Sequence, residues 1–389
     1  MRFTLLVLPL LLCACSTPDP DRFNRVLSGL APIYSASRLE VVAELSVPPG
    51  NLAVSAKGRV FLTLHPEASP EIHVVELGAD GELIPFPNAA WQRERDDKPY
   101  WVTPLGIRVD SQDRLWILDH GDYGSEPSSL TAFDLATGEL VLRHVFSSDV
   151  AGWGTMLNDL AVDAERGYVY IADPGPFTFG PGLVIFEIAT GEAWRALDDH
   201  DSVVAEDFHH VVQGRFMRAY GLALQIGVDS IGISGDGTQL IYGPLSGDRL
   251  YQVPTAALRD RALDPADSVT VYGPKPTTDG IVVDRAGNVY LTAIEHDALA
   301  VLSPGEPRLR VLVSDSERLA WPDGVALSFD ERYLYASVSE LHRVIGMDLD
   351  ELSQHAPFRV VRLLLRDEPA EAEPSSPEPG EDGSAGAGR

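Results

Sequence analysis

The chain has 389 residues, with 58 acidic and 30 basic side chains that give it a formal charge of −28. This excess of negative charge repels polyphosphate backbones, so a function in nucleic-acid binding, which depends on Lys and Arg, is excluded. The two cysteines, Cys13 and Cys15, both lie near the N-terminus. The rest of the chain therefore has neither a disulfide framework nor a cysteine-based zinc site.

Residues 1–14 predict a signal peptide that ends at a lipid attachment site. A basic start precedes an apolar run over 3–12, which is too short to span a bilayer. The tetrad Leu12-Cys-Ala-Cys15 resembles the lipobox of bacterial lipoproteins, so we expect cleavage before Cys15 and lipidation of its thiol. Residues 15–37 then form a lipidated tether. The expected location is the cell envelope, in the outer membrane and facing the periplasm or the surface, with the lipid as the membrane contact. An ordinary secretory peptide on a secreted protein is the alternative.

The other end of the chain, residues 367–389, is predicted to be a disordered acidic tail. It combines acidic residues with Pro, Ser, Gly and Ala and has no large apolar side chain. Such a segment buries too little surface to offset the entropy of ordering it.

Between these ends one pattern occurs six times. An alternating apolar strand closes on Asp or Ser, a short polar turn follows, and a second alternating strand comes next. The closing residues are Ser55, Asp110, Asp163, Ser234, Asp284 and Ser328. Strand pairs that repeat about every 40–50 residues are typical of propeller blades. The sequence therefore predicts an all-β fold, a six-bladed β-propeller over residues 38–366, in which 38–47 or 358–365 completes a blade begun at the other terminus.

The longest interval, from Asp163 to Ser234, holds an insertion of about 20 residues relative to the other blades. It contains the acidic and His-rich runs 198–201 and 206–210. Three interpretations stay open: a lid, a metal clip of His and carboxylate ligands, or a solvated surface loop.

The residues that enter the first strand of each blade are expected to gather at one end of the central axis. The outer ring would be Gly50, Leu105, Asn158, Asp229, Asp279 and Asp323, and the next ring Asn51, Gly106, Asp159, Ser230, Gly280 and Gly324. Asn158, Asp229 and Asp279 offer oxygen ligands for Ca²⁺ or another divalent cation. Without a cation, crowded carboxylates raise one another's pKa and hold protons instead, and the sequence leaves both outcomes open. A third interpretation is that these residues only shape the loops.

The ends of the second strands point to the same end of the molecule and carry further polar groups. We predict a ligand-binding set of Asn51, Asp159, Asp323 and His342. The predicted catalytic set is His120, His296, Asp173 and Glu295, in which the two histidines carry protons and the carboxylates, with Asp279, orient or charge them. The partner is a small molecule, and a flat one could stack on aromatic side chains of the same loops.

Ordered motifs across roughly residues 40–366 resemble the major royal jelly protein/yellow family, in its bacterial branch related to dopachrome tautomerase. They include Leu105-Gly-Ile-Arg-Val-Asp110, Asn158-Asp-Leu-Ala-Val-Asp163, Tyr242-Gly-Pro-Leu-Ser246 and Trp321-Pro-Asp-Gly324. The resemblance implies a six-bladed propeller with a small-molecule site at the channel mouth. Some members convert dopachrome, others bind amines or other ligands, and others are nutrient or structural proteins. The expected function is thus a tautomerase-like isomerase of a small aromatic or quinonoid compound, or a non-catalytic binding or envelope scaffold.

The repeats are also similar, more distantly, to the regucalcin/gluconolactonase propellers. That resemblance implies a divalent metal held by a Glu, an Asn and an Asp at the starts of inner strands. Asn158 and Asp279 match this pattern, Asp229 stands where one ligand Asn would be, and Gly50 stands where the Glu would be. A metal-dependent lactonase is therefore the alternative function. The chain has no Gly-x-Ser-x-Gly motif, which disfavours a serine hydrolase.

Overall fold

The computed structural model describes residues 26–95, 98–176, 180–207, 209–219, 222–345, 352 and 354–366. The predicted signal peptide, Cys15, the first part of the tether and the tail over 367–389 lie outside these residues. Within them, no helix is both long enough and apolar enough to span a membrane.

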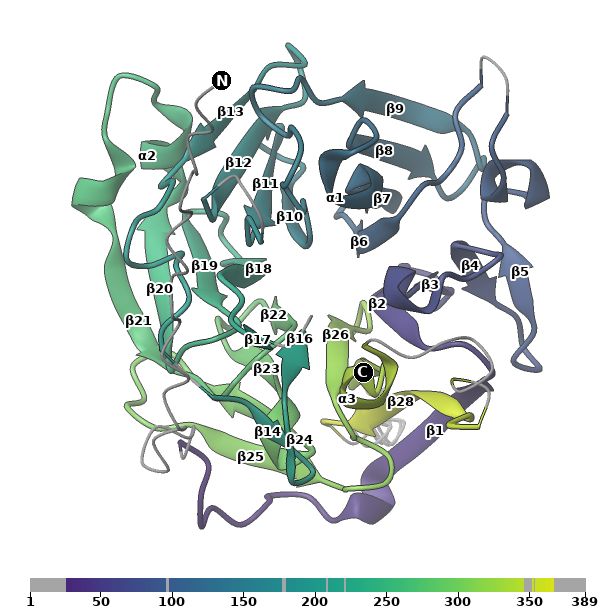
Figure 1. Ribbon diagram of the computed structural model, residues 1–389. Coiled ribbons are helices and arrows are strands. Elements are labelled where there is room, and N and C mark those ends of the chain that lie inside the picture. Colours follow the sequence, from purple (N-terminus) through teal and green to yellow (C-terminus); the bar gives the residue numbers. More distant parts are fainter. Residues whose placement is uncertain are drawn as a thin grey trace, which may run out of the picture.

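Six four-stranded antiparallel sheets surround a central axis, and Figure 1 looks down this axis. Blade 1 comprises β2 (Pro49–Val54), β3 (Val60–Leu64), β4 (Val74–Leu77) and β5 (Leu83–Pro85). Blade 2 comprises β6 (Pro104–Val109), β7 (Arg114–Asp119), β8 (Ser129–Asp134) and β9 (Leu140–Val145). Blade 3 comprises β10 (Leu160–Asp163), β11 (Tyr168–Asp173), β12 (Gly182–Glu187) and β13 (Ala193–Ala196).

The later blades repeat this plan, so the predicted six-bladed β-propeller is confirmed. Blade 4 comprises β18 (Val228–Ile233), β19 (Gln239–Pro244), β20 (Arg249–Pro254) and β21 (Thr270–Pro274). Blade 5 comprises β22 (Ile281–Val283), β23 (Val289–Ala293), β24 (Ala298–Leu302) and β25 (Arg310–Ser314). Blade 6 comprises β26 (Pro322–Leu327), β27 (Tyr333–Val338), β28 (Phe358–Leu364) and β1 (Leu39–Leu45).

Blade 6 closes the ring by pairing the two ends of the propeller. Its strand order is β26, β27, β28, β1, so the N-terminal strand lies outermost against β28. Both segments that the sequence offered for closure are used, one as the third strand and the other as the fourth. The pairing runs from Leu39 opposite Leu363 to Leu45 opposite Phe358. This arrangement covers the edge of β28, which would otherwise be open for pairing with another chain.

Buried side chains between neighbouring blades form the core. Leu52 of β2, for example, belongs to the same apolar cluster as Tyr335 and Val360 of blade 6. Near the axis the inner strands approach so closely that side chains are excluded at some positions. A Cβ on Gly106 would lie 2.3 Å from the carbonyl oxygen of Asn158, and one on Gly280 would lie 2.5 Å from that of Asp323. Glycine is therefore required there by packing.

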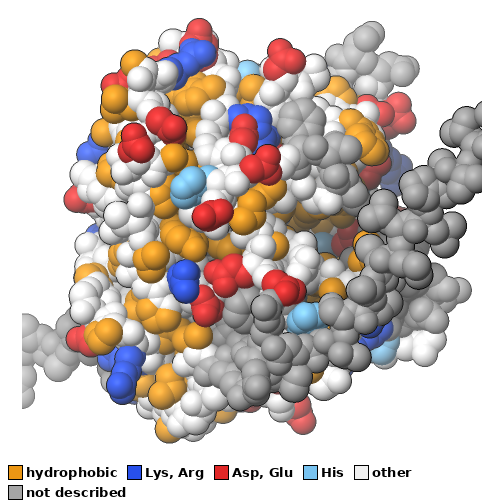
Figure 2. Space-filling model, turned by 60° about the vertical axis from the view of Figure 1, so that its left-hand side comes forward, with side chains coloured by type: hydrophobic (Ala, Val, Ile, Leu, Met, Phe, Trp, Pro, Cys, Tyr) orange, Lys and Arg blue, Asp and Glu red, His pale blue; other side chains and the backbone are white. Residues whose placement is uncertain are grey.

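The helices are short and lie in connections between strands. They are α1 (Gly121–Gly124), α2 (Thr255–Arg259) and α3 (Leu341–Val344), with single turns η1 (Ala36–Arg38), η2 (Pro66–Ala68), η3 (Ala89–Gln92), η4 (Pro265–Ser268) and η5 (Ile294–His296). On the face shown in Figure 2, acidic and basic side chains are scattered among hydrophobic ones.

The predicted insertion falls within the segment 198–227, whose described residues pack onto two neighbouring blades, and we call this segment the cap. It contains β14 (Val211–Val212), β15 (Arg215–Phe216), β16 (Arg218–Ala219) and β17 (Leu222–Ala223), which lie in front of blade 5 in Figure 1. Val211 N donates to Glu295 Oε1 (2.7 Å) in blade 5, and Arg215 Nη1 donates to the His342 carbonyl (2.6 Å) in blade 6. Apolar side chains of the cap are buried with Ile294 and Trp321. The cap is thus part of the core packing and more than a solvated loop.

Candidate functional site

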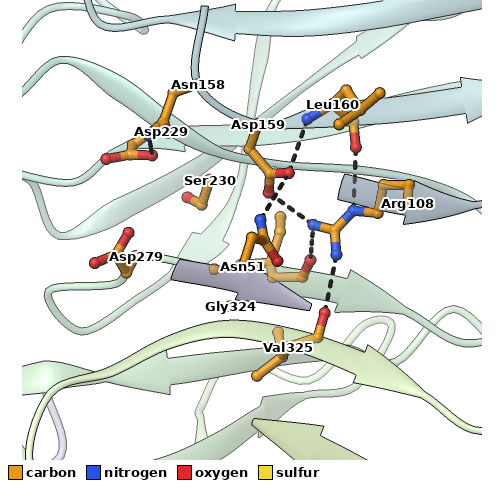
Figure 3. A network of polar contacts seen from close by, with 12 residues as sticks. Asn51, Arg108, Asn158, Asp159, Leu160, Asp229, Ser230, Asp279, Gly324 and Val325 are labelled. Atoms are coloured by element: carbon orange, nitrogen blue, oxygen red, sulfur yellow. Dashed lines mark hydrogen bonds and ion pairs between the residues drawn. The ribbon is translucent and has the colours of Figure 1, made fainter. Parts of the chain in front are cut away.

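The inner strands begin at the same end of the axis, and we call this end the channel mouth. The inner strands of successive blades, β2, β6, β10, β18, β22 and β26, contact one another around the axis. The topology therefore brings the two predicted rings of polar residues together. Figure 3 shows Asn158, Asp229 and Asp279 on one side of the view and the guanidinium of Arg108 on the other.

Arg108 closes the axis beneath the mouth by joining four blades. From β6 its Nη2 binds Asp159 Oδ2 (2.6 Å), and its Nε donates to the Leu160 carbonyl (3.1 Å). It also donates to the carbonyls of Ile281 (3.2 Å) and Val325 (2.9 Å) in blades 5 and 6 (Figure 3). A guanidinium is well suited to this role because its five donors spread in a plane.

Two of the predicted ligand-binding residues belong to this inner network. Asn51 Nδ2 donates to Asp159 Oδ1 (3.1 Å), and Asn51 Oδ1 accepts from Leu52 N (2.8 Å). Asp159 Oδ1 also accepts from Leu160 N (2.8 Å). Asn51 and Asp159 therefore use their polar groups to join blades 1, 2 and 3 and to bind the backbone N–H of the next residue, a role that sequence reasoning missed. No signal in the alternating pattern distinguishes Arg108 from an outward-facing residue of its strand.

Three carboxylates crowd the mouth above this network. Asp229 and Asp323 are buried, with 4% and 6% of their surfaces exposed, and Asp279 is half-buried. Asn158 Nδ2 donates to Asp229 Oδ1, and Trp321 Nε1 donates to Asp279 Oδ2 (2.8 Å). Among the described residues Asp323 Oδ2 has no hydrogen-bond partner. The structure thus brings together the predicted metal residues and one predicted ligand residue.

Burial and mutual repulsion shift the protonation of these carboxylates. Burial raises the pKa of Asp279 to about 6, and the nearby Asp159 charge adds to the effect. Burial, together with the Asp279 charge, holds the pKa of both Asp229 and Asp323 well above the usual range. Like charges in a poorly solvated site favour the protonated form, so this cluster holds protons near neutral pH.

Lys275 places a buried amine just before the inner strand of blade 5. Its side chain is completely buried, and Nζ donates to the carbonyls of Leu245 (3.3 Å), Gly247 (2.9 Å) and Pro276 (3.1 Å). Burial lowers the pKa of its amine to about 7, whereas nearby carboxylates, Glu206 foremost, raise it. Sequence reasoning did not select this residue. The sequence feature that could have pointed to it is its position between Pro274 and Pro276, just before the inner strand of blade 5.

His120, a predicted proton carrier, lies at the end of β7. Its Nδ1 accepts from Tyr123 N (3.0 Å) and lies 3.3 Å from Thr103 Oγ1. Among the described residues its Nε2 is buried without a partner. Burial, with the nearby His65, lowers the pKa of His120 to about 3, so the ring is neutral at pH 7.

His342 lies beside Trp321, which contacts one of the mouth carboxylates. Its ring is parallel to that of Trp321, with the ring centroids 6.4 Å apart, and Trp321 in turn binds Asp279. Only 4% of the residue is exposed, yet neither of its ring nitrogens has a hydrogen-bond partner within the described part of the chain. Burial lowers its pKa to about 4.

The remaining predicted catalytic residues have structural contacts. Asp173 is buried and pairs with Arg195 Nη1 (2.7 Å) within blade 3. Glu295 accepts from Thr277 Oγ1 (2.5 Å) and from Val211 N of the cap (2.7 Å). His296 ends the η5 turn, and its carbonyl accepts from Ser314 Oγ (3.2 Å). These contacts do not test a role in catalysis, but they show Asp173 in an ion pair of its own rather than beside a predicted proton carrier.

The residues at the mouth do not form a good site for the divalent metal that the second resemblance implies. Asn158 points its amide nitrogen, a donor, at Asp229. A Cβ at Gly50, where that family has Glu, would lie 2.7 Å from Leu105 Cδ1 and 3.0 Å from Thr63 Oγ1. Within the described ranges, no group of three or more His, Cys, Asp and Glu side chains is arranged to hold a metal ion. The oxygen donors that a Ca²⁺ ion needs are therefore incomplete.

Comparison with known proteins decides the family. The profile described as Major royal jelly protein matches residues 102–370, which is most of the chain. The chain belongs to the major royal jelly protein family. The first resemblance read from the sequence is thus confirmed, and the mouth described above is the mouth of a propeller of this family.

Curated relatives include the proteins named yellow of Drosophila erecta and Drosophila melanogaster. Each is 29% identical to this chain over 202 residues, which is 47% of this chain and 36% of the relative. The match spans about a third of the length of these relatives. What the whole relatives do therefore does not pass to this chain by similarity alone.

Solved structures with a similar fold include members of the second group that the sequence resembles. A gluconolactonase from Xanthomonas campestris has a TM-score of 0.54 and 15% identity, over 84% of this chain and 89% of that one. A calcium-binding regucalcin from Agrobacterium tumefaciens has a TM-score of 0.51 and 16% identity, over 86% and 95%. At these identities the likeness establishes a shared propeller fold.

Proposed function

We propose that the channel mouth binds a small carbonyl or quinonoid compound and isomerises it by moving a proton. The observation that carries this proposal is the cluster of Asp229, Asp279 and Asp323 at the mouth, where Asp323 Oδ2 is buried without a partner among the described residues and burial raises the pKa of all three carboxyl groups. A general acid or base works best when its pKa lies near the operating pH. Asp279, with a pKa of about 6, meets this condition.

The reaction needs one carboxylate that accepts a proton and one protonated carboxyl group that donates a proton. Asp279, as the carboxylate, takes a proton from a carbon next to the substrate carbonyl, and the electron pair of that C–H bond forms the new C=C bond. Asp323, protonated, donates its proton to the carbonyl oxygen and gives an enol. In a substrate whose reacting carbon also neighbours a C=C bond, this enol is a dienol. Asp279 then returns its proton to the far carbon of that C=C bond, the double bond moves next to the carbonyl carbon, and Asp323 regains the proton from the oxygen, which releases the isomer and restores both residues.

The contacts around Asp279 and Asp323 support different roles for the two residues, Asp279 as the base and Asp323 as the acid. Trp321 Nε1 holds Asp279 Oδ2, which leaves Oδ1 for the substrate proton. Asp323 has its Oδ2 buried and without a partner among the described residues, as a group kept for a ligand would be. His342, parallel to Trp321, borders the same place and is neutral at pH 7.

The test is a tautomerisation assay in the presence of a chelator, using an aminochrome followed by its absorbance. The wild-type protein should accelerate the conversion over buffer. Asp279→Asn should lower kcat by about 10²- to 10⁴-fold, the usual contribution of a general acid or base. Glu192→Gln, in an exposed ion pair with Arg261, is the matched control. Binding without turnover would favour the scaffold function, and hydrolysis of a lactone that needs an added metal would favour the lactonase.

The metal-dependent lactonase has support from fold similarity to the gluconolactonase, and fold does not fix function. Because the donor set at the mouth is incomplete, we derive no step through a metal. A ligand-binding scaffold predicts binding at the mouth without turnover. An envelope scaffold predicts that substitutions at the mouth change neither binding nor activity.

We also propose that the chain is anchored in the cell envelope by a lipid on Cys15. The lipobox-like tetrad that ends at Cys15 supports this proposal. In a bacterial host that processes lipoproteins, the full chain should fractionate with membranes and lose this behaviour in the Cys15→Ser variant. A soluble wild-type protein cleaved elsewhere would contradict it and favour the secreted form.

A further inference from the structure

A pocket of about 180 Å³ opens at the end of the axis opposite the channel mouth, and we call it the lower pocket. The inner strands of blades 1, 2, 5 and 6 begin at the mouth and end at this pocket, which their last residues line. These residues are Val54, Val109, Val283 and Leu327. The lower pocket therefore lies at the other end of the inner strands from the mouth carboxylates.

The walls of the lower pocket are mostly apolar. Its apolar lining combines buried and half-buried side chains, namely Leu52, Val54, Ala326, Val109, Val282, Val283 and Leu327. An apolar group that enters would remove the half-buried side chains from water, which is favourable. An apolar protein cavity of about 150 Å³ binds benzene. The lower pocket therefore has room for a single six-membered ring.

Arg108 supplies a polar group to this pocket, which it lines with 14% of its side chain exposed. Its Nη1 donates to the Val325 carbonyl (2.9 Å), and the next residue, Ala326, also lines the pocket. Its Nε and Nη2 donate to Asp159 and to two further carbonyls (Figure 3). A guanidinium has five N–H groups, and its contacts with described residues account for four of them. One N–H of Nη1 is thus left for a ligand.

The rim of the lower pocket adds a second guanidinium and an exposed ring. The guanidinium carbon of Arg285 lies 5.3 Å from the ring centroid of Phe329, whose surface is 60% exposed. Glu331 is the one carboxylate of the lining, and its Oε1 accepts from Arg285 N (2.9 Å) and lies 3.6 Å from Arg285 Nη1. The lining therefore carries two positive charges and one negative charge, in a protein whose formal charge is −28.

From this arrangement we infer that the lower pocket binds a small aromatic monocarboxylate, with the carboxylate on Arg108 and the ring against the apolar walls. A hydrogen bond from a guanidinium to a carboxylate is stronger than one between neutral groups, so charge should decide the choice of ligand. The inference goes beyond the proposed isomerisation. The lining shares no residue with the carboxylates at the mouth, so a failure of one can be told from a failure of the other.

The first experiment titrates the wild-type protein with sodium benzoate by calorimetry at pH 7.5. We expect one site with a Kd of about 1 mM or below, an ordinary affinity for so small a ligand. Benzamide has the same shape without the charge, and acetate has the charge without the ring. Each should bind at least about 10-fold more weakly than benzoate. Equal affinity for benzamide, or no saturable binding of benzoate up to about 20 mM, would overturn the inference.

The second experiment locates the site with variants. Val109→Phe fills the lower pocket and should weaken benzoate binding by about 10-fold or more. Val141→Phe is the matched control, because it makes the same change at a position of β9 that is 51% exposed. Asp279→Asn, at the mouth, should leave the affinity for benzoate unchanged. Benzoate affinity that survives Val109→Phe, or that is lost in Asp279→Asn, would contradict binding in the lower pocket.

A third measurement needs no variant and decides if Val109→Phe does not fold. Benzoate is added to wild-type protein with labelled Val and Leu methyl groups, and the methyl resonances are followed by nuclear magnetic resonance. The largest shifts should fall on Val54, Val109, Val283 and Leu327, which line the lower pocket. Shifts confined to residues elsewhere would overturn the inference.

Discussion

Arg108 Nη2 lies 2.6 Å from Asp159 Oδ2, and this ion pair joins blades 2 and 3 at the centre of the propeller. The same guanidinium reaches the carbonyls of Ile281 and Val325 in blades 5 and 6. Since 14% of the Arg108 side chain and 5% of the Asp159 side chain are exposed, solvent screens the pair little.

Removal of one partner of this pair should be costly. Arg108→Met leaves Asp159 buried without its counterion, and we expect a loss of about 3–5 kcal/mol in the free energy of unfolding. Arg261→Met is the control, because its pair with Glu192 is exposed and should contribute under about 1 kcal/mol. Urea denaturation measures both, and equal losses in the two variants would show that the central network does not hold the blades together.

The mouth carboxylates should make stability depend on pH. The pKa of Asp279 is raised to about 6 from an ordinary 3.8, so the folded state holds its proton more tightly than the unfolded chain. The resulting stabilisation is complete below pH 3.8 and is lost as the pH rises through 6. Above pH 6 the wild-type protein therefore carries the cost of a buried charge.

Asp279→Asn should remove that cost. We expect the variant to be more stable than the wild type by about 1–3 kcal/mol at pH 8, and to show a smaller gain at pH 4.5. The buried histidines also lower the stability of the protein as the pH falls. They are present in both proteins, so a comparison of the two at the same pH cancels their contribution. A gain that is the same at both pH values would mean that Asp279 has no shifted pKa.

Asp173→Asn tests whether this residue is structural. It removes the charge that faces Arg195 Nη1 at 2.7 Å within blade 3, where 9% of the Arg195 side chain is exposed. We expect a loss of about 3–5 kcal/mol of stability. If the variant is as stable as the wild type, the ion pair does not stabilise the fold and Asp173 is again a candidate for proton transfer.

Closure of the ring predicts that β1 is needed for a monomeric propeller. Deletion of residues 26–47 removes the strand that covers β28 and exposes its edge to pairing with other chains. We expect aggregation, or a Tm lower by about 10 °C, in the deleted protein. Deletion of 367–389 is the control and should leave the Tm unchanged. A soluble, equally stable protein without β1 would show that β28 does not need its partner.

The fold could be predicted from the sequence because the same pair of alternating strands recurs in every blade. A closing Asp or Ser marks the end of the first strand in each of the six pairs. The ring of Asn158, Asp229, Asp279 and Asp323 followed from that repeat. Arg108 and Lys275 did not, because their roles depend on contacts between blades. The alternating pattern that places Arg108 on a strand does not predict that its guanidinium reaches across the axis to other blades. Burial of Lys275 depends on a loop of another blade, and no local pattern records it.

The measurement that tests the central claim most directly is solvent deuterium incorporation into small carbonyl and quinonoid compounds, followed by mass spectrometry. The protein is incubated in deuterium oxide with a chelator, and wild type is compared with Asp279→Asn and the Glu192→Gln control. Proton transfer at the mouth predicts deuterium at a carbon next to a carbonyl with the wild type and the control, and a rate lower by about 10²-fold or more with Asp279→Asn. Exchange that is equal in all three proteins, or absent across compounds that bind, would contradict it.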